Sequence, residues 1–499
     1  MEPAIQNKLD RVSDGAAPRV LDLFSGCGGL SLGFARAGFE IVGAVEFDAE
    51  AVRTHARNFH AGVRDGDADV HAVARDITRV TPAELGAEFG WNGPPDSWVD
   101  LVIGGPPCQA FARIGRAKLR EIAEHPQAFL EDPRANLFRR YLDYVADLRP
   151  LAVLMENVPD VINHGGRNIP HEVCEALEKL GYDCGYTLLN AVAYGVPQMR
   201  DRMFLLAFHR DLAADVGFPA PTHWIDLPRG YHATRQVALR NVPQNLLGDD
   251  HFFVPPTDPT PDLLPAATAQ AALRDLPRIS THLEGRMKKG PARFDEWLSY
   301  PRSPRPSEYG KLMRTWPGYS SPEGVCDHVI RYLPRDYAIF RRMAPGDQYP
   351  EAHAVARAIF EERLAELRQD GRVVPEGSAE WQELRASVIP PYDPGKFPNK
   401  WRKMEPDRPS RTLMAHIGKD SYSHIHYDSS QARTISVREA ARLQSFPDGF
   451  RFAGAMNSAF RQIGNAVPPL LAGALADHIR SALRDAEPVD QAFAVRSAA

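Results

Sequence analysis

The chain has 499 residues, of which 43% are apolar and 25% are charged. This composition excludes a collagen, a coiled coil and a wholly disordered chain, and the length corresponds to two to four domains of roughly 100–200 residues each. The net charge of −5 excludes a protein coated in positive charge. Any contact with nucleic acid must therefore be confined to local basic patches.

No apolar run approaches the roughly 18–20 residues of a membrane span. The first twenty residues include Lys8, Asp10 and Arg11 where a signal peptide needs an apolar block. We therefore expect a cytoplasmic protein that has no membrane contact. The five cysteines are odd in number and lack Cys-x-x-Cys spacing, so we expect reduced thiols rather than a disulfide framework or a zinc site.

Short β-rich apolar runs alternate with helical stretches over residues 19–208. The expected strands are Arg19–Phe24, Ile41–Glu46, Leu101–Gly104, Ala152–Glu156 and Met203–Phe208. The expected helices between them are Leu30–Ala37, Ala49–Asn58, Leu137–Leu148 and His171–Leu180. This alternation implies right-handed crossovers, so we expect an α/β domain whose doubly wound sheet is mostly parallel.

The alternation stops near residue 210. Prolines crowd residues 218–306, a charged helical segment covers Glu351–Gln369, and helical signals return with a capping box at Ser436 and Glu439 and a last helix, Leu470–Leu483. We expect the 351–369 helix either to pack within this region or to dock a partner. The expected division is a tail (1–17), a first domain (18–212), a smaller loop-rich domain (213–430), a segment completing the first domain (431–485) and a tail (486–499).

A glycine-rich turn follows the first expected strand. It consists of Phe24, Ser25, Gly26, Cys27, Gly28, Gly29 and Leu30. Glycines let a backbone adopt positive φ and pass close to a ligand, and a helix begins at once, as at the nucleotide sites of doubly wound sheets.

Acidic residues end the next two apolar segments. Glu46 lies about twenty residues beyond the glycines, where a carboxylate can accept both hydroxyls of a ribose, and Phe47 could stack on the base. Asp76 and Ile77 are similarly placed to meet the amino group of an adenine.

A cysteine stands where the third expected strand leaves the sheet, in the run Pro106-Pro107-Cys108-Gln109. Open α/β sheets hold their ligands at this edge. A lone cysteine is more often a small buried hydrophobe than a nucleophile, but the two prolines present this thiol at a rigid corner.

These motifs resemble those of the DNA (cytosine-5)-methyltransferase family of prokaryotic type, and they occur in the family's order. The glycine turn resembles its S-adenosylmethionine loop, and the Pro-Pro-Cys-Gln run resembles its nucleophile motif. Four further runs continue the match: Glu156-Asn157-Val158, Gln198-Met199-Arg200-Asp201-Arg202, Arg438–Gln444 and Gly464–Pro469. The resemblance covers about residues 18–210 and 410–480, and it implies a Rossmann-like S-adenosylmethionine methyltransferase sheet with a target-recognition domain.

The resemblance implies S-adenosyl-L-methionine as cofactor and S-adenosyl-L-homocysteine as product. Beside the glycine turn, Glu46, Phe47, Asp76 and Ile77, it adds these cofactor-binding residues: Pro107, Leu137, Asn465, Ala466 and Val467. We expect no metal, because His416, His424 and His426 have no cysteine or carboxylate that completes a ligand set at standard spacing.

The expected reaction begins when the thiolate of Cys108 adds to C6 of cytosine, which makes C5 nucleophilic enough to take a methyl group. Glu156 ends an apolar strand, where it could bond the N3 and amino edge of the base and deliver a proton to N3. Burial should raise its pKa. The resemblance implies that Arg202 contacts the O2 carbonyl of cytosine and that Arg200 organises Glu156 and Cys108.

Double-stranded DNA is the expected partner, and the target base must be flipped out of the duplex to reach such a site. The loop from Gln109 to Arg134 is the expected lid and is longer than the usual family loop. Residues 396–419 carry a local excess of positive charge. The candidate DNA contacts are Gln109, Arg113, Arg116, Lys118, Lys400, Arg402, Lys403, Arg411 and Lys419.

The expected function is therefore methylation of C5 of cytosine at a short duplex site, by a nucleoid-associated enzyme acting as a monomer on DNA. Family habit suggests self-marking in restriction-modification or phage defence, with a cognate restriction or defence protein as partner. A tRNA cytosine methyltransferase would not need so large a middle block. A nicotinamide-dependent oxidoreductase would leave Cys108, Glu156 and the two arginines unassigned, and these residues also count against an inactive DNA-binding member.

Overall fold

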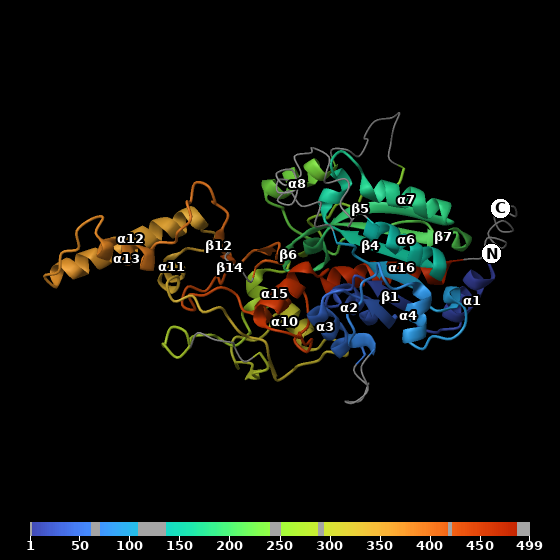
Figure 1. Ribbon diagram of the computed structural model, residues 1–499, viewed down its shortest axis with the longest axis horizontal. Coiled ribbons are helices and arrows are strands. Elements are labelled where there is room, and N and C mark those ends of the chain that lie inside the picture. The colour runs from blue at the N-terminus through green and yellow to red at the C-terminus, as the bar shows by residue number, and fades with distance from the viewer. Residues whose placement is uncertain are drawn as a thin grey trace. The chain divides into compact units, whose positions relative to one another are not determined.

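The computed structural model describes residues 2–60, 70–107, 136–239, 251–287, 294–417 and 422–486. The chain forms two compact units, which we call unit 1 (residues 1–266 and 466–499) and unit 2 (residues 267–465). Figure 1 shows the elements of both units. Within the described ranges, none of the helices has the length and apolar character needed to cross a membrane.

Unit 1 contains a mixed six-stranded sheet in the order β2-β1-β3-β4-β7-β5. The strands are β1 (Arg19–Leu23), β2 (Glu40–Val45), β3 (Leu101–Gly104), β4 (Ala152–Asn157), β5 (Tyr182–Asn190) and β7 (Asp201–His209). Strands β1 to β4 are mutually parallel, whereas β7 runs antiparallel to both β4 and β5. The five strands expected from the sequence are confirmed to within two residues, and β5 was not expected.

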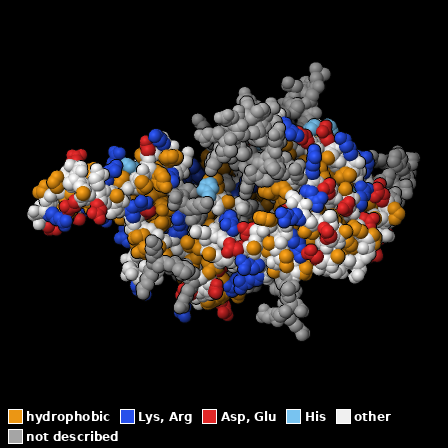
Figure 2. All heavy atoms as spheres, viewed as in Figure 1, with side chains coloured by type: hydrophobic (Ala, Val, Ile, Leu, Met, Phe, Trp, Pro, Cys, Tyr) orange, Lys and Arg blue, Asp and Glu red, His pale blue; other side chains and the backbone are white. Residues whose placement is uncertain are grey.

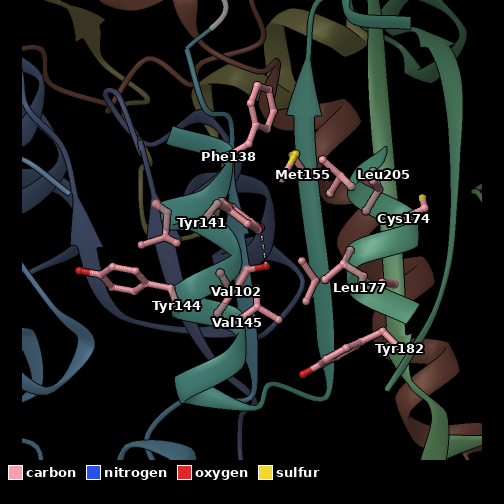
Figure 3. Close-up of a cluster of buried hydrophobic side chains, with 14 of the residues drawn as sticks. Val102, Phe138, Tyr141, Tyr144, Val145, Met155, Cys174, Leu177, Tyr182 and Leu205 are labelled. Atoms are coloured by element: carbon pink, nitrogen blue, oxygen red, sulfur yellow. Dashed lines mark hydrogen bonds between the residues drawn. The ribbon is translucent and has the colours of Figure 1, made fainter. Parts of the chain in front are cut away.

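Helices cover both faces of this sheet (Figure 1). One face packs against α1 (Pro3–Ser13), α2 (Gly29–Arg36) and α16 (Pro469–Asp485), and the other packs against α4 (Pro82–Glu88), α6 (Asn136–Leu148) and α7 (Ile169–Lys179). Figure 3 shows the second face, where Tyr141 of α6 donates a hydrogen bond to the carbonyl of Val102 (3.2 Å). The remaining elements of unit 1 are α3 (Ala49–Phe59), α8 (Arg229–Ala238), β6 (Gln198–Met199), β8 (His223–Trp224) and β9 (Leu264–Pro265).

The N-terminal residues that we expected to be a tail instead form helix α1. Ile5 and Leu9 are buried in the core beside the sheet, and the Nζ of Lys8 donates to the carbonyls of Leu148 (2.8 Å) and Arg149 (2.7 Å). Lys8 therefore satisfies carbonyls at the C-terminal end of α6, which the helix itself leaves without partners. Burial lowers the pKa of Lys8 to about 7.

The unit boundaries differ from the expected domain boundaries at residues 213 and 431. Residues 252–254 continue the sheet beyond its edge strand, because Tyr186 N–H donates to Phe252 O (2.8 Å) and Val254 N–H donates to Tyr186 O (2.9 Å). This pairing keeps residues up to 266 in unit 1. Conversely, α14 and α15 belong to unit 2.

Unit 2 is rich in loops. Its helices are α9 (Ala269–Leu273), α10 (Glu308–Arg314), α11 (Tyr337–Arg342), α12 (Tyr349–Gln369), α13 (Ala379–Val388), α14 (Val437–Leu443) and α15 (Met456–Asn465). Its strands are β10 (Leu298–Ser299), β11 (Gly324–Val325), β12 (Trp401–Lys403), β13 (Ser410–Arg411) and β14 (Tyr422–Ile425). The expected helix at 351–369 is confirmed as α12, which packs on α11 and α13 (Figure 1), and the capping box at Ser436 and Glu439 is confirmed.

A chain of buried ion pairs holds unit 2 together. The guanidinium of Arg442 in α14 lies between two carboxylates, donating to Asp275 Oδ1 (2.7 Å), Asp448 Oδ1 (2.8 Å) and Asp448 Oδ2 (2.7 Å). All three side chains are fully buried. Removing one member of such a cluster leaves buried charge without compensation, so α14 and the segments carrying both acids depend on one another.

Arg442→Met should therefore lower the free energy of unfolding by about 3–5 kcal/mol, since buried Asp448 loses its ion-pair partner and buried Asp275 keeps only Arg314. The matched control is Arg342→Met, because Arg342 pairs with Glu362 where both side chains are about half exposed, and such a pair contributes roughly 0–1 kcal/mol. Urea unfolding followed by tryptophan fluorescence measures both values. Equal effects of the two substitutions would contradict the structural role given to Arg442.

Candidate active site

The glycine turn follows the carboxyl end of β1 and leads into α2. Phe24, Gly26 and Gly28 all have positive φ, and Gly28 N–H donates to Ser25 O (2.9 Å). A Cβ on Gly28 would lie 2.4 Å from the ring of Phe59, and one on Gly29 would lie 2.2 Å from the carbonyl oxygen of Val467. The turn therefore requires glycine at both positions, because neighbouring atoms already occupy the space that a side chain would need.

Glu46 supports this turn from the end of β2. Its carboxylate accepts hydrogen bonds from Gly26 N–H (2.8 Å) and Asp48 N–H (2.7 Å), and burial raises the pKa of Glu46. The next side chain, Phe47, is 75% exposed, which is unusual for a large aromatic residue. The structure thus brings the glycine turn, an acid and an exposed aromatic ring to one edge of the sheet.

Asp76 and Ile77 lie beside the same edge, because Arg75 N–H donates to Glu46 O (2.7 Å). The Asp76 carboxylate accepts from the backbone N–H (3.0 Å) and hydroxyl (2.7 Å) of Thr78, and the hydroxyl bond is the main cause that lowers the pKa of Asp76. Ile77 is buried, and its carbonyl accepts a bond from Arg140 of α6 (3.1 Å). Leu137, at the start of α6, is partly buried against the same core.

The corner after β3 consists of Gly104, Gly105, Pro106 and Pro107. The side-chain amide of Asn157 donates to Pro106 O (3.0 Å), which ties this corner to the end of β4. A Cβ on Gly105 would lie 2.8 Å from Glu156 Oε2, so the corner passes close to that carboxylate. Cys108 follows Pro107 in the sequence and lies outside the described residues.

Glu156 and Arg202 form an ion pair next to this corner. Arg202 Nε lies 2.8 Å from Glu156 Oε1, and each side chain is 12% exposed. Burial raises the pKa of Glu156, and the positive charges of Arg202 and Arg200 oppose that shift. Arg200 is fully buried, and burial, together with the nearby charge of Arg202, lowers its pKa. Three of the four expected catalytic residues therefore lie together.

Two asparagines position these groups: Asn157, which the sequence analysis named only as part of the Glu156-Asn157-Val158 run, and Asn190, which it did not name. Asn157 anchors the corner after β3, and Asn190 at the end of β5 anchors the arginine motif. The Asn190 side chain accepts from Arg200 N–H (3.1 Å) and Val192 N–H (3.1 Å) and donates to Asp201 Oδ1 (2.9 Å). An asparagine followed by a short helical turn is typical of an N-cap, and this signal could have identified Asn190.

The C-terminal cofactor candidates divide between the units. Ala466 and Val467 belong to unit 1, where Val467 is buried and the Ala466 side chain would contact a Cβ at Gly29 (3.1 Å). Asn465 is the last residue of α15 in unit 2 and is exposed.

Among the expected DNA contacts, Lys403 requires a correction. It is fully buried, and its ammonium donates to Phe340 O (2.7 Å), Met343 O (2.8 Å) and Ser429 Oγ (2.6 Å), so it is a structural residue that no phosphate can reach. Arg402 is partly buried and bonds to Glu405 (2.8 Å), and the Lys400 ammonium lies 3.5 Å from the centroid of the Tyr392 ring.

The side chain of Arg411 is exposed. Gln109, Arg113, Arg116, Lys118 and Lys419 lie outside the described residues. Figure 2 shows basic and acidic side chains interspersed on the visible face, as the small net charge predicts.

The three histidines considered as ligands differ in surroundings. His424 and His426 are buried, and His424 bonds to the carbonyl of Arg411 (3.0 Å). His416 is exposed. Over the described ranges, no three histidine, cysteine or acidic side chains gather as a metal site would require. None of the four described cysteines, Cys27, Cys174, Cys184 and Cys326, takes part in a disulfide.

The sequence matches the family described as C-5 cytosine-specific DNA methylase over residues 18–255 and 351–481. The relative M.OihORF3336P of Oceanobacillus iheyensis is 39% identical over 470 residues, which cover 94% of this chain and 96% of the relative. The type II methyltransferase M.AgeI of Thalassovita gelatinovora is 32% identical over 496 residues, covering 93% of this chain and 100% of the relative.

The fold is also similar to a solved structure. A prophage-encoded protein of E. coli, described as a DNA modification methyltransferase, has a TM-score of 0.59 and 21% identity, with coverage of 94% of this chain and 100% of that chain. The sequence match to M.OihORF3336P covers nearly the whole chain, and the mixed Rossmann-like sheet agrees with it. The chain belongs to the C-5 cytosine-specific DNA methylase family and is a DNA cytosine-5 methyltransferase.

Proposed function

We propose that this enzyme methylates a cytosine flipped out of a short, specific duplex site, through a covalent bond between Cys108 and C6 of the base. The observation that carries the proposal is the buried Glu156–Arg202 ion pair beside the corner that ends at Pro107. A flat polar heterocycle needs such a pair, because the carboxyl group bonds to its N3 and amino edge while the guanidinium donates to its carbonyl oxygen.

Cys108 supplies the nucleophile in this scheme. Its thiolate adds to C6, forming a C–S bond and moving electron density to C5. C5 would then take the methyl group as the methyl–sulfonium bond of S-adenosylmethionine breaks, leaving S-adenosylhomocysteine. Loss of the C5 proton to water would return its electron pair to the ring, and the C–S bond would break to release the thiolate of Cys108. Glu156 holds a proton for N3, and burial favours its protonated form because it raises the pKa of this carboxyl. Arg200, held by Asn190, organises the acid and the thiol.

The glycine turn and its neighbours would hold S-adenosylmethionine. Bound there, this cofactor supplies an electrophilic methyl group on a sulfonium centre. The fit rests on the open space beside Gly26, where no atom lies within 4 Å of an added Cβ, on the buried carboxylate of Glu46 for ribose hydroxyls and on the exposed ring of Phe47 for adenine. Asp76 and Ile77 would bind the adenine amino edge. Pro107, Leu137, Ala466 and Val467, which also belong to unit 1, would complete the cofactor site.

Unit 2 would recognise the DNA site, with Lys400, Arg402 and Arg411 among the residues that contact phosphates. The related type II methyltransferase M.AgeI supports a restriction-modification role, in which methylation marks the cell's own DNA against a cognate nuclease. We propose that the enzyme works as a monomer on nucleoid DNA. Copurification of S-adenosylhomocysteine, detected by mass spectrometry, tests the cofactor assignment independently of the DNA site.

Cys108→Ser should fold and bind S-adenosylmethionine but lose methyl transfer by several orders of magnitude, because an alcohol is a far weaker nucleophile than a thiolate. Bisulfite sequencing of plasmid DNA from cells expressing each form measures the effect. Methylation at one short motif that disappears in the variant is the expected result. Substantial methylation by the variant would exclude Cys108 as the nucleophile, and no methylation by the well-folded parent would make cellular tRNA the next substrate to test.

Duplex DNA that carries 5-fluorocytosine at the target should become covalently attached to the enzyme in the presence of S-adenosylmethionine. Fluorine cannot leave C5 as a proton does, so the C–S bond persists. A band of increased mass on a denaturing gel reports the adduct, and the Cys108→Ser variant is the control without it. If a confirmed target site gave no adduct with the parent enzyme, addition to C6 would be the wrong mechanism.

Arg202→Met should lower kcat and move the alkaline limb of the kcat–pH profile to higher pH. Glu156 acts in its protonated form, so activity is present below its pKa and falls as the pH rises through that value. Because the charge of Arg202 lowers the pKa of Glu156, removing the charge raises it. The control is Arg210→Met. Arg210 pairs with Asp183 where both side chains are about half exposed, at the opposite end of the β5–β7 strand pair from Arg202. A limb that does not move would argue against Glu156 as the acid.

A further inference from the structure

A line of buried polar side chains lies beneath the glycine turn and joins three elements of unit 1. Ser31 of α2 donates its hydroxyl to Asp22 Oδ2 of β1 (2.6 Å), and the same Ser31 Oγ lies 2.9 Å from His55 Nε2 of α3. All three side chains are 0% exposed. None of them has a part in the mechanism described above, although buried polar groups are costly and are retained where they do something specific.

The His55 end of this line supports the turn directly. The space where a Cβ of Gly28 would stand is filled by the rings of Phe59 (2.4 Å) and His55 (3.0 Å). These two rings are neighbours on α3, with centroids 4.6 Å apart. The position of the His55 ring therefore fixes how closely the backbone of the turn can approach α3.

The Asp22 end is anchored in the sheet. Asp22 is the fourth residue of β1, and its carboxylate reaches Ser31 two residues after the start of α2. The turn begins two residues after Asp22 and leads directly into α2. The Asp22–Ser31 bond thus spans the turn from strand to helix and holds its two ends together.

The bonds can form with neutral groups. Burial lowers the pKa of His55 well below its ordinary value, with His60 and His71 acting in the same direction, so His55 is neutral near pH 7. Burial and the nearby charge of Glu46 raise the pKa of Asp22 to about 7, while the bond from Ser31 lowers it. Whether Asp22 is protonated or ionised, the Ser31 hydroxyl can donate a hydrogen bond to one of its two partners, Asp22 or His55, and accept a hydrogen bond from the other.

We propose that Asp22, Ser31 and His55 are positioning residues that hold the glycine turn, residues 24–30, in the conformation that binds S-adenosylmethionine. The inference rests on the proposed cofactor site. Ser31 is the junction, because its hydroxyl bonds both to Asp22 of β1 and to His55 of α3. The three residues act through the backbone of the turn, which Glu46 holds from its other side.

Ser31→Ala tests the junction in the full chain. We expect the Kd for S-adenosylmethionine, measured by isothermal titration calorimetry, to rise about tenfold, since two buried hydrogen bonds are lost. The KM for S-adenosylmethionine should rise with it, whereas kcat at saturating cofactor and the KM for DNA should stay near their parent values. A residue with a merely structural role would not produce this division between the two KM values.

Tyr182→Phe is the matched control. It also removes a buried hydroxyl bond within unit 1, from Tyr182 to Pro150 O (2.9 Å), but at the first residue of β5 and away from the turn. It should leave the Kd for S-adenosylmethionine unchanged. Equal weakening by both substitutions, or an unchanged Kd in Ser31→Ala, would overturn the proposal. Failure of the parent enzyme to bind S-adenosylmethionine would instead overturn the proposed cofactor site itself, together with this inference.

If Ser31→Ala does not fold, two variants of His55 test the positioning role instead. The side-chain amide nitrogen of His55→Gln can take the place of Nε2 and keep the bond to Ser31, whereas His55→Leu fills similar space without it. We expect His55→Gln to bind S-adenosylmethionine nearly as tightly as the parent and His55→Leu about tenfold more weakly. Equal affinity of the two variants would contradict the positioning role.

Discussion

The candidate site depends on the ion pair between Glu156 and Arg202, which joins β4 to β7 at one end of the sheet. Burying a carboxylate is costly, and the guanidinium offsets that cost only where the two groups touch. The antiparallel pairing of β7 with β4 provides that contact, because Glu156 lies opposite Phe204, two residues from Arg202. Strand β7, which runs opposite to its neighbours β4 and β5, therefore places the arginine motif beside Glu156.

The same edge of the sheet collects the other groups by simpler means. Strands β1, β2, β3 and β4 are parallel, so their carboxyl ends meet at one edge, and each is followed by a segment of the candidate site. Asparagine side chains then fix the segments that the sheet leaves irregular. Asn157 holds Pro106, and Asn190 holds the backbone of Arg200. The strands set the approximate positions of the segments that form the candidate site. The hydrogen bonds from Asn157 and Asn190 then fix these segments in place.

Unit 2 shows how a segment outside the family match can support residues inside it. Arg438 and Arg442 lie within the matched range 351–481, whereas their partners Asp327 and Asp275 lie in the unmatched residues 256–350. Arg438 also donates to the carbonyls of Cys326, Pro447 and Phe450. Two buried cations in α14 thus pair with acids from an intervening segment, which ties that segment to the part of unit 2 that matches the family.

The sequence by itself determined five of the six strands of the main sheet and the helices α2, α3, α6, α7, α12 and α16, since these depend on local apolar runs and chain order. It did not predict β5, where Asp183 and Gly185 interrupt the β-rich pattern, or α1, whose apolar positions are few and become evident only against the sheet. Only the tertiary structure decided that Lys403 is buried, that Asn157 and Asn190 anchor the site, and that Asp22 meets Ser31 and His55. Hydrogen bonds between residues that are distant in sequence depend on tertiary packing, and a local sequence pattern does not predict that packing.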